Sequence, residues 1–167
     1  MLKKLLIWTV LFLNSQVTYS YPSRPNPEET QGELCSQSNS DFKEFRYKEQ
    51  IPYCIRNVDS QKKSQIYDAY QIPIECRYRY TIDHFIPLSI GGSNSDSNLW
   101  PEHKLVKATR PNLEVELYKS LKDGSITQVE AIKIIKKEKI KAVATFLFKQ
   151  FSNNIGNDCD KVDTISE

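Results

Sequence analysis

The stretch from residue 77 to residue 102 constrains the fold of this chain most strongly. Residues 77–88 alternate in polarity and are rich in aromatic and β-branched side chains, which predicts a strand that Pro87 ends. The Gly91-Gly92 pair and the serine, asparagine and aspartate residues after it predict a loop. Residues 98–101 are expected to form a second short strand. With helices predicted on both sides, this order favours an α+β fold.

The helices are predicted from apolar spacing and capping residues. Ser60 is expected to cap a helix over residues 61–70. Gly124 is expected to end a second helix, and the capping-box spacing of Thr127 and Glu130 predicts the start of a long amphipathic third helix. The residues expected to face inward on the three helices are Ile66, Tyr67, Tyr70, Leu113, Leu117, Tyr118, Leu121, Val129, Ile132, Ile135, Ile140, Val143 and Leu147, with Phe146, Phe148 and Phe151 adding to the core.

The first twenty residues are typical of a secretory signal peptide. Lys3 and Lys4 precede a short apolar run at residues 5–13, and small residues lie near Ser20. The run is too short to cross a bilayer, which needs about 20 residues. A buried N-terminal helix is the weaker alternative. We therefore expect a periplasmic or secreted protein whose mature form has no membrane span.

The remainder is expected to divide into three parts. Residues 21–40 combine Pro22, Pro25 and Pro27 with polar residues, which predicts a flexible Pro-rich linker. Residues 41–151 suit a single domain. Residues 152–167 form an acidic C-terminal tail.

Four cysteines in an exported chain predict two disulfides. Four cysteines allow three connectivities, and the sequence does not choose among them. Cys54–Cys76 with Cys35–Cys159 is preferred, because the first would brace the segment before the candidate site and the second would join the ends of the domain. A zinc site is disfavoured because no pair has the close Cys-x-x-Cys spacing.

The mature chain is balanced in charge, but its charges are unevenly distributed. The full chain has 23 Lys and Arg residues against 21 Asp and Glu residues, and loss of Lys3 and Lys4 leaves 21 of each sign. A generally basic protein is therefore excluded, and any nucleic-acid affinity must come from a local patch. Residues 103–149 hold eleven basic and five acidic residues. The alternative is that these lysines only solvate a helix face: Lys133, Lys136, Lys137, Lys139 and Lys141.

Candidate chemistry lies in the pair Asp83-His84, within the first predicted strand. An Asp-His dipeptide alone carries little information, since a surface acid beside a hydrogen-bonded histidine has the same sequence. The surroundings are more specific: Pro87 and the Gly-Gly loop follow, and Asn98 lies fourteen residues after the histidine.

This pattern resembles the HNH (ββα-metal) endonuclease superfamily. More specifically, it resembles an exported bacterial branch that has roughly Asp-His-x-Ile-Pro-Leu-x-x-Gly-Gly-x-Asn followed by Asn-Leu-Trp-Pro-Glu. The resemblance covers about residues 54–135, roughly half of the chain. The matching residues are Asp83, His84, Ile86, Pro87, Leu88, Gly91, Gly92, Asn94, Asn98, Leu99, Trp100, Pro101 and Glu102.

The resemblance implies a small ββα-metal core with flanking helices, braced here by disulfides, and phosphodiester hydrolysis with a divalent cation, by default Mg²⁺. His84 would be the general base, Asp83 a metal ligand, and Asn98 a residue that orients His84 or pins the loop. Neighbouring side chains of a regular strand point to opposite faces, so Asp83 and His84 could share one centre only where the strand twists or breaks.

The chain departs from the family pattern at the third signature residue. The superfamily usually has a metal-binding His or Asn about nine residues after the central Asn, where this chain has Lys107. His103 and Asn112 are the alternative ligands, and water completing the metal shell is a third possibility.

Phosphate contacts are expected from basic residues that bracket the motif, although structural salt bridges are an equal alternative for each. No recognition-helix or zinc-finger pattern is found, so cleavage with little sequence preference is expected, on DNA more than on RNA. Trp100 is expected in the core. The candidate phosphate ligands are Arg77, Arg79, Lys107 and Arg110.

Three functions stay open. The first is an exported metal-dependent endonuclease. The second is a catalytically inactive protein of the same fold that binds nucleic acid or metal. The third is an unrelated disulfide-stabilised secreted binding protein. An inhibitor or immunity partner is left open.

Overall fold

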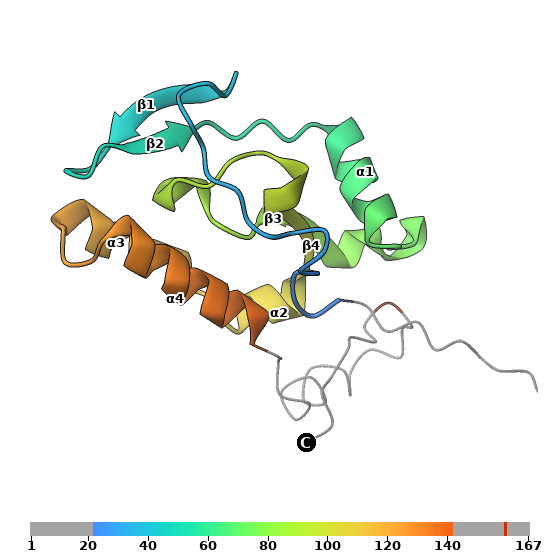
Figure 1. Ribbon diagram of the computed structural model, residues 1–167. Coiled ribbons are helices and arrows are strands. Elements are labelled where there is room, and N and C mark those ends of the chain that lie inside the picture. Colours follow the sequence, from blue (N-terminus) through green and yellow to red (C-terminus); the bar gives the residue numbers. More distant parts are fainter. Residues whose placement is uncertain (1–21, 142–158, 160–167) are drawn as a thin grey trace, which may run out of the picture.

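A computed structural model describes residues 22–141 and Cys159. This part of the chain is α+β, as predicted, with two small antiparallel sheets and helices packed around them (Figure 1). The helices and strands, in chain order, are β1 (Phe42–Arg46), β2 (Ile51–Cys54), α1 (Ser60–Ala69), η1 (Ile74–Arg79), β3 (Tyr80–His84), η2 (Leu88–Ile90), η3 (Asp96–Asn98), β4 (Leu99–His103), α2 (Lys104–Ala108), α3 (Leu113–Asp123) and α4 (Gln128–Ile140).

The β3–β4 pair carries the candidate site. The two strands are antiparallel, with Asp83 opposite Trp100 and His84 opposite Leu99, and α2 follows β4 directly. The order strand, strand, helix is the one that the family resemblance implies. The strand predicted at residues 77–88 was too long at both ends: residues 77–79 belong to the 3₁₀ helix η1, which begins after the extended Pro73, and β3 ends at His84, before Pro87.

The loop between β3 and β4 is fixed by glycine and by backbone contacts. Gly91 has φ 92°, a left-handed conformation that favours glycine. A Cβ at Gly92 would lie 1.8 Å from the carbonyl oxygen of Ile86. The loop can therefore fold this tightly only without a side chain at that position.

The predicted caps are confirmed at two of three helices. α3 ends at Gly124, which has φ 79°, and both capping-box bonds between Thr127 and Glu130 are present at α4. The cap of α1 is Asp59 rather than Ser60, because the Asp59 side chain accepts the backbone N–H of Lys62 at 2.8 Å.

The main core joins β2, the β3–β4 loop, α3 and α4 through a cluster of buried apolar residues: Ile51, Ile86, Ile90, Leu117, Leu121, Ala131 and Ile135. A second cluster packs Trp100, as expected, with Phe85 and Val106.

The inner face of α4 differs from the prediction. Its buried residues are Ala131, Ile135 and Lys139, spaced four apart, whereas Val129 is 75% exposed and Ile140 is 48% exposed. Ile135 is buried as predicted and Ile132 packs partly buried on the main core, but the buried stripe also contains Ala131 and Lys139, which the prediction did not include. The remaining core predictions, Val143, Phe146, Leu147, Phe148 and Phe151, lie outside the described residues.

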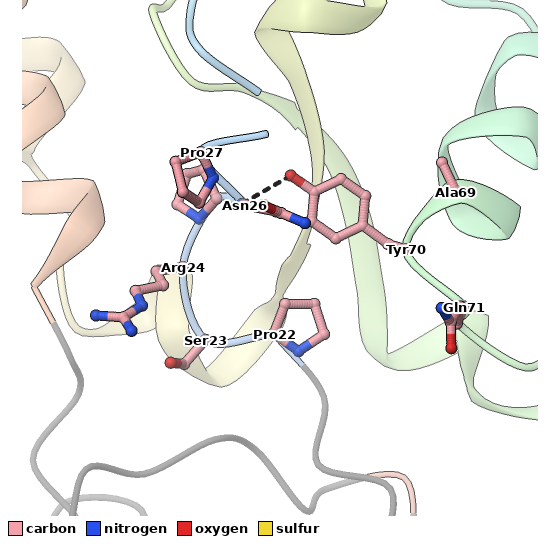
Figure 2. A pocket seen from close by; sticks show the side chains of 9 residues that line it. Pro22, Ser23, Arg24, Asn26, Pro27, Ala69, Tyr70 and Gln71 are labelled. Carbon is pink, nitrogen blue, oxygen red and sulfur yellow. Dashed lines mark hydrogen bonds between the residues drawn. The ribbon is translucent and has the colours of Figure 1, made fainter. Parts of the chain in front are cut away.

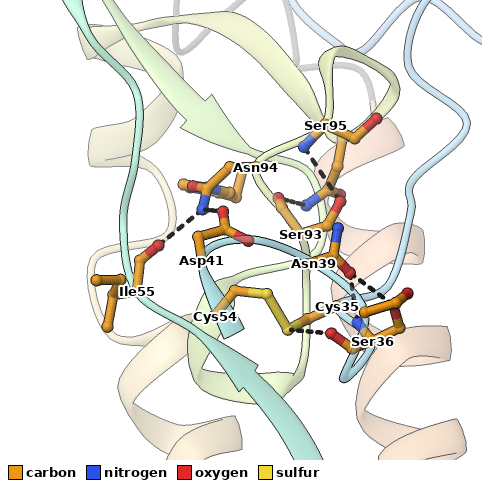
Figure 3. Close-up of a disulfide and its surroundings, with 12 residues drawn as sticks. Cys35, Ser36, Asn39, Asp41, Cys54, Ile55, Ser93, Asn94 and Ser95 are labelled. Carbon is orange, nitrogen blue, oxygen red and sulfur yellow. Dashed lines mark hydrogen bonds between the residues drawn. A yellow bond between two sulfur atoms is a disulfide. The ribbon is translucent and has the colours of Figure 1, made fainter. Parts of the chain in front are cut away.

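Both disulfides are present, but the preferred pairing was wrong. The pairs are Cys35–Cys54 and Cys76–Cys159, with Cα–Cα distances of 5.8 and 5.2 Å. Cys54 ends β2 and lies beside Cys35, as Figure 3 shows. Cys76 lies in η1, in a separate buried cluster with Cys159. Cys54 and Cys76 therefore belong to different parts of the fold, although they are close in sequence.

The Pro-rich segment that was expected as a linker packs against the domain instead. The Thr30 side chain is 1% exposed and donates to the Leu99 carbonyl oxygen of β4 at 2.8 Å. The backbone N–H of Asn26 donates to the Tyr70 hydroxyl at 2.9 Å, beside a cavity of about 410 Å³ (Figure 2). Polar groups of this segment thus find partners on β4 and on Tyr70, the C-cap residue of α1, which its proline content did not indicate.

The predicted signal peptide and the acidic tail lie outside the described residues, apart from Cys159. Within residues 22–141, no helix has the length and apolar character that crossing a membrane requires.

Candidate functional site

Asp83 and His84 are the last two residues of β3, and their side chains are held by different partners. Both residues are buried, with exposed fractions of 8% and 4%. The His84 ring contacts Arg56 and Asn94, whereas the Asp83 carboxylate contacts Lys107 and Lys139. The divergence expected for neighbours in a strand is therefore found here.

The His84 side is a hydrogen-bond network centred on Asn94. The Asn94 Nδ2 group donates to the Asp41 carboxylate and, at 2.7 Å, to the Ile55 carbonyl oxygen (Figure 3). A carboxylate and a carbonyl only accept, so the amide orientation of Asn94 is determined. Its Oδ1 atom lies 2.9 Å from His84 Nε2, which must therefore donate to it.

The same network sets the tautomer of His84. With the proton on Nε2, the Nδ1 atom carries a lone pair. The Arg56 Nη1 group donates to this atom at 3.1 Å, and Arg56 Nη2 donates to the Ile82 carbonyl oxygen at 2.8 Å. Burial, then the charges of Arg56 and Lys139, lower the pKa of His84, while Asn94 and Asp83 oppose the shift. The ring is thus neutral at neutral pH, with its basic nitrogen toward the exposed Arg56 side chain.

The Asp83 side is a cluster of charged groups. Lys139 Nζ lies 3.0 Å from one carboxylate oxygen of Asp83, and Lys107 Nζ lies 3.1 Å from the other. Lys139 also donates to the His84 carbonyl oxygen at 2.7 Å and to Glu114 at 2.8 Å. The Lys139 side chain is only 2% exposed, so it does not solvate the face of α4 as the alternative reading had it. Its three acceptors compensate the cost of burying its charge.

Glu102 belongs to the same cluster. Its side chain is 1% exposed and is paired with Arg110. Burial, followed by its hydrogen bond with Asp83, raises the pKa of Glu102 to about 7. Burial also opposes ionisation of Asp83, but Lys139, Glu102 and Lys107 together lower the pKa of Asp83 below its ordinary value. The pKa of Glu102 therefore lies near neutral pH, whereas the pKa of Asp83 lies well below it.

The contacts of Asp83 do not fit a divalent cation. Both of its oxygens face ammonium groups. At an effective dielectric constant of about 20, two unit charges about 4 Å apart interact by about 4 kcal/mol, so each ammonium would repel a divalent ion by about twice that amount. Among the described residues, no three His, Cys, Asp or Glu side chains are grouped so that they could hold a metal ion.

The two alternative ligands lie in other environments. His103 is fully buried and packs edge-on against Tyr80, with ring centroids 4.9 Å apart. Its Nδ1 atom accepts the backbone N–H of Leu105 and so caps α2. Asn112 precedes α3 and lines a surface pocket with Arg110 and Glu116.

Asn98 holds the loop. Its Nδ2 group donates to the carbonyl oxygens of Ile86 and Ser93 at 2.9 and 2.8 Å, and its Oδ1 atom accepts the Ile86 N–H at 2.9 Å. These bonds use both donors and the acceptor of the amide, so Asn98 fixes the backbone after β3. The group that holds the His84 ring is Asn94.

The candidate phosphate ligands separate into two groups. Lys107 and Arg110 belong to the Asp83 cluster. Arg77 pairs with Asp68 of α1 and donates to Ser64, and Arg79 lies over the ring of Tyr78. The structure therefore brings only the first two to the candidate site.

Four side chains of the site had no role assigned from the sequence. Asn94 and Glu102 were visible as parts of the matched motif, so their positions carried a signal. Arg56 lies in the segment between β2 and α1, and Lys139 is one of several lysines in α4. Neither residue has a pattern that distinguishes it from a solvated surface charge.

Compared with known proteins, the chain matches no family model, no curated protein and no solved structure. The case for a function therefore depends on the residues of the site themselves.

Proposed function

We propose that this chain is a nuclease that hydrolyses phosphodiester bonds, with His84 as the general base. The observation that carries the proposal is the tautomer of His84: Asn94 accepts from Nε2, which leaves a lone pair on Nδ1. A neutral imidazole fixed in this way can take a proton from water at neutral pH. The order of β3, β4 and α2, and the likeness to the HNH pattern in residues 83–102, support the same reaction class.

Arg56 connects this base to a substrate. Its guanidinium covers Nδ1 in the free protein, and guanidinium groups bind phosphate oxygens through paired donors. A bound phosphodiester would draw Arg56 toward its oxygens and leave Nδ1 free for water. The water oxygen then bonds to phosphorus, His84 takes the water proton, and the bond to the leaving oxygen breaks. That oxygen takes a proton from solvent.

The proposed substrate is DNA, cleaved with little sequence preference, and the proposed location is the periplasm or the exterior of the cell. Two disulfides are compatible with an oxidising compartment. A divalent cation such as Mg²⁺, expected from the family resemblance, stays a prediction, although the lysines around Asp83 do not favour it.

The test is cleavage of supercoiled plasmid, single-stranded DNA and RNA by the oxidised chain without its first twenty residues. His84→Ala should lower the cleavage rate by about 10²- to 10⁴-fold, because a positioned general base contributes that much. Lys63→Ala, an exposed change on α1, is the control and should cleave at the wild-type rate. Circular dichroism verifies that each variant is folded. A folded His84→Ala variant that cleaves normally contradicts the proposal.

One observation favours a second candidate, a protein of this fold that binds nucleic acid without cleaving it. His84 is 4% exposed, and both of its ring nitrogens are engaged. If Arg56 stays on Nδ1 when nucleic acid binds, water cannot reach the base. Binding without cleavage of any of the three substrates, with and without divalent ions, would identify this candidate.

A further inference from the structure

We infer that Asp41 is a positioning residue of this site, whose carboxylate holds the Asn94 amide in the orientation that fixes the tautomer of His84. This inference rests on the proposed function for the role of His84 as the base. Asp41 directly precedes β1 and lies 53 residues before Asn94, outside the matched motif. The sequence alone therefore gave no reason to connect it with the ring.

Three side chains form a continuous series of hydrogen bonds from Asp41 to the ring. His84 Nε2 donates to Asn94 Oδ1 at 2.9 Å, and the Asn94 Nδ2 group donates to the Asp41 carboxylate (Figure 3). A carboxylate only accepts, so it excludes the reversed amide, which would turn an oxygen toward Asp41. The reversed amide would also donate to Nε2 and move the ring proton to Nδ1. The carboxylate thus excludes the orientation in which the proposed base has its lone pair on the wrong nitrogen.

Asp41 is the stronger of the two acceptors that hold this amide. The other acceptor is the Ile55 carbonyl oxygen, which lies 2.7 Å from Asn94 Nδ2. Hydrogen bonds to an ionised acceptor are roughly twice as strong as those between neutral groups. Ile55 is also 46% exposed and directly precedes Arg56, the side chain that a bound phosphodiester is proposed to draw away. The orientation of Asn94 should therefore depend mainly on Asp41.

The main chain of Asp41 supports the other side of the ring. The Ile55 N–H group donates to the Asp41 carbonyl oxygen at 2.9 Å, which extends the β1–β2 ladder one residue beyond the Phe42–Cys54 pair. The next residue is Arg56, whose guanidinium donates to Nδ1 of the ring. Asp41 thus holds the partner of Nε2 through its side chain and the segment that carries the partner of Nδ1 through its backbone.

The surroundings of Asp41 leave its carboxylate to the amide. Asp41 is half-buried and lines a pocket of about 290 Å³ together with Asn94 and Lys62. The Lys62 ammonium pairs with Asp96 at 3.2 Å and donates to the Asn94 carbonyl oxygen at 2.9 Å. The lysine of this pocket therefore holds the main chain of Asn94, and the carboxylate of Asp41 holds its side chain.

Nitrogen-15 NMR of the His84 ring tests the inference without using activity. At mildly alkaline pH, where a histidine ring is neutral, the oxidised wild type should show one tautomer with its proton on Nε2. Asp41→Ala should show both tautomers. Asp41→Asn keeps an oxygen that can accept from the Asn94 amide, so it should recover the single tautomer. The matched control is Ser40→Ala, an exposed change in the same pocket, which should give the wild-type spectrum.

Cleavage kinetics measure the functional consequence. Asp41→Ala should lower kcat by about 10- to 100-fold, which is the rate equivalent of losing one hydrogen bond to a charged group. KM should change little, because Asp41 acts through Asn94 and not on the substrate. Asp41→Asn should recover most of the rate, and Ser40→Ala should cleave as the wild type does. Should Asp41→Ala fail to fold, Asp41→Ser replaces it, since its shorter side chain keeps a hydroxyl group in the pocket.

The outcomes separate this inference from the proposed function. If the wild type cleaves no substrate, the proposed function fails, and the NMR comparison still decides whether Asp41 sets the tautomer. A folded Asp41→Ala or Asp41→Ser protein that keeps the single tautomer would show that the Ile55 carbonyl oxygen is sufficient, and the inference would be overturned.

Discussion

Asp83 and His84 are neighbours in β3, yet their side chains lie in different electrostatic surroundings. Around His84, Asn94 accepts a hydrogen bond from Nε2 and the exposed Arg56 guanidinium donates one to Nδ1, which holds an uncharged ring in one tautomer. Around Asp83, the ammonium groups of Lys107 and Lys139 each pair with one oxygen of a buried carboxylate. The first arrangement keeps a group ready to accept a proton. The second fixes charge in space.

This difference shows how one strand can serve two purposes. Alternating side chains let β3 present a proton acceptor to one set of elements and an ion cluster to another. Lys139 joins the two sides, because its ammonium contacts the Asp83 carboxylate and the His84 carbonyl oxygen together. The position of His84 therefore depends on the charges around Asp83.

The largest effect on the charge cluster around Asp83 is expected from Lys139→Met. This change leaves Asp83 and Glu114 without their buried cation and should lower the free energy of unfolding by about 3–5 kcal/mol. Urea denaturation measures the effect. The matched control is Lys133→Met, an exposed position in α4, where a change within about 0.5 kcal/mol is expected. Similar values for the two variants would mean that the cluster contributes no more than surface lysines do.

The His84 side is tested by Asn94→Ala. Loss of the Asn94 oxygen frees His84 Nε2 from its acceptor, so both tautomers become populated and the cleavage rate should fall by about 10²-fold. Nitrogen-15 NMR of the His84 ring should show the mixture directly. Asn57→Ala, an exposed change in the pocket that Asn94 also lines, serves as the control. Wild-type cleavage by a folded Asn94→Ala protein would remove Asn94 from the mechanism.

The pH profile should show a smaller effect. Burial, Arg56 and Lys139 lower the pKa of His84, with Asn94 and Asp83 opposing them, so the acid limb of cleavage should lie below the ordinary histidine value of 6.5. Arg56→Ala removes one lowering charge and should move that limb upward. Rates measured at constant ionic strength provide the comparison, and a limb that stays in place would show that Arg56 has no effect on the base.

The free energy of unfolding should also fall as the pH becomes mildly acidic. Because the pKa of folded His84 is below its unfolded value, the unfolded chain binds more protons at mildly acidic pH. The contribution of neutral His84 to stability is therefore complete above pH 6.5 and is lost as the pH falls toward the pKa of the folded state.

The local parts of the fold could be predicted from the sequence, since each depends on residues close in the chain. Gly124 ends α3 and the Thr127–Glu130 pair starts α4, as their spacing indicated. The disulfide pairing and the packing of residues 22–40 could not be predicted, because they depend on which distant segments meet. Leu34, next to the disulfide-bonded Cys35, forms a β-bridge with Gly92, which is far away in the sequence.

For the candidate site, the residues within the motif could be predicted, but their contacts and the distant residues could not. The motif located Asp83, His84 and Asn94 in the chain, but the assignment of the orienting amide needed the geometry of Asn94 and Asn98. Lys139 lies 56 residues from Asp83, and its helix contains other lysines that remain exposed. Nothing in its local sequence marks it as buried, so only the packed structure reveals it.

Gly92 has a consequence for how this site will vary among related chains. Because a Cβ there would meet the Ile86 carbonyl oxygen at 1.8 Å, mutation at this codon is expected to be eliminated by selection as strictly as mutation of His84. Gly92, which has no reactive atom, would then be as invariant among related chains as the proposed base His84. In this stretch, evolutionary constraint measures how tightly the backbone is folded as well as which groups do chemistry.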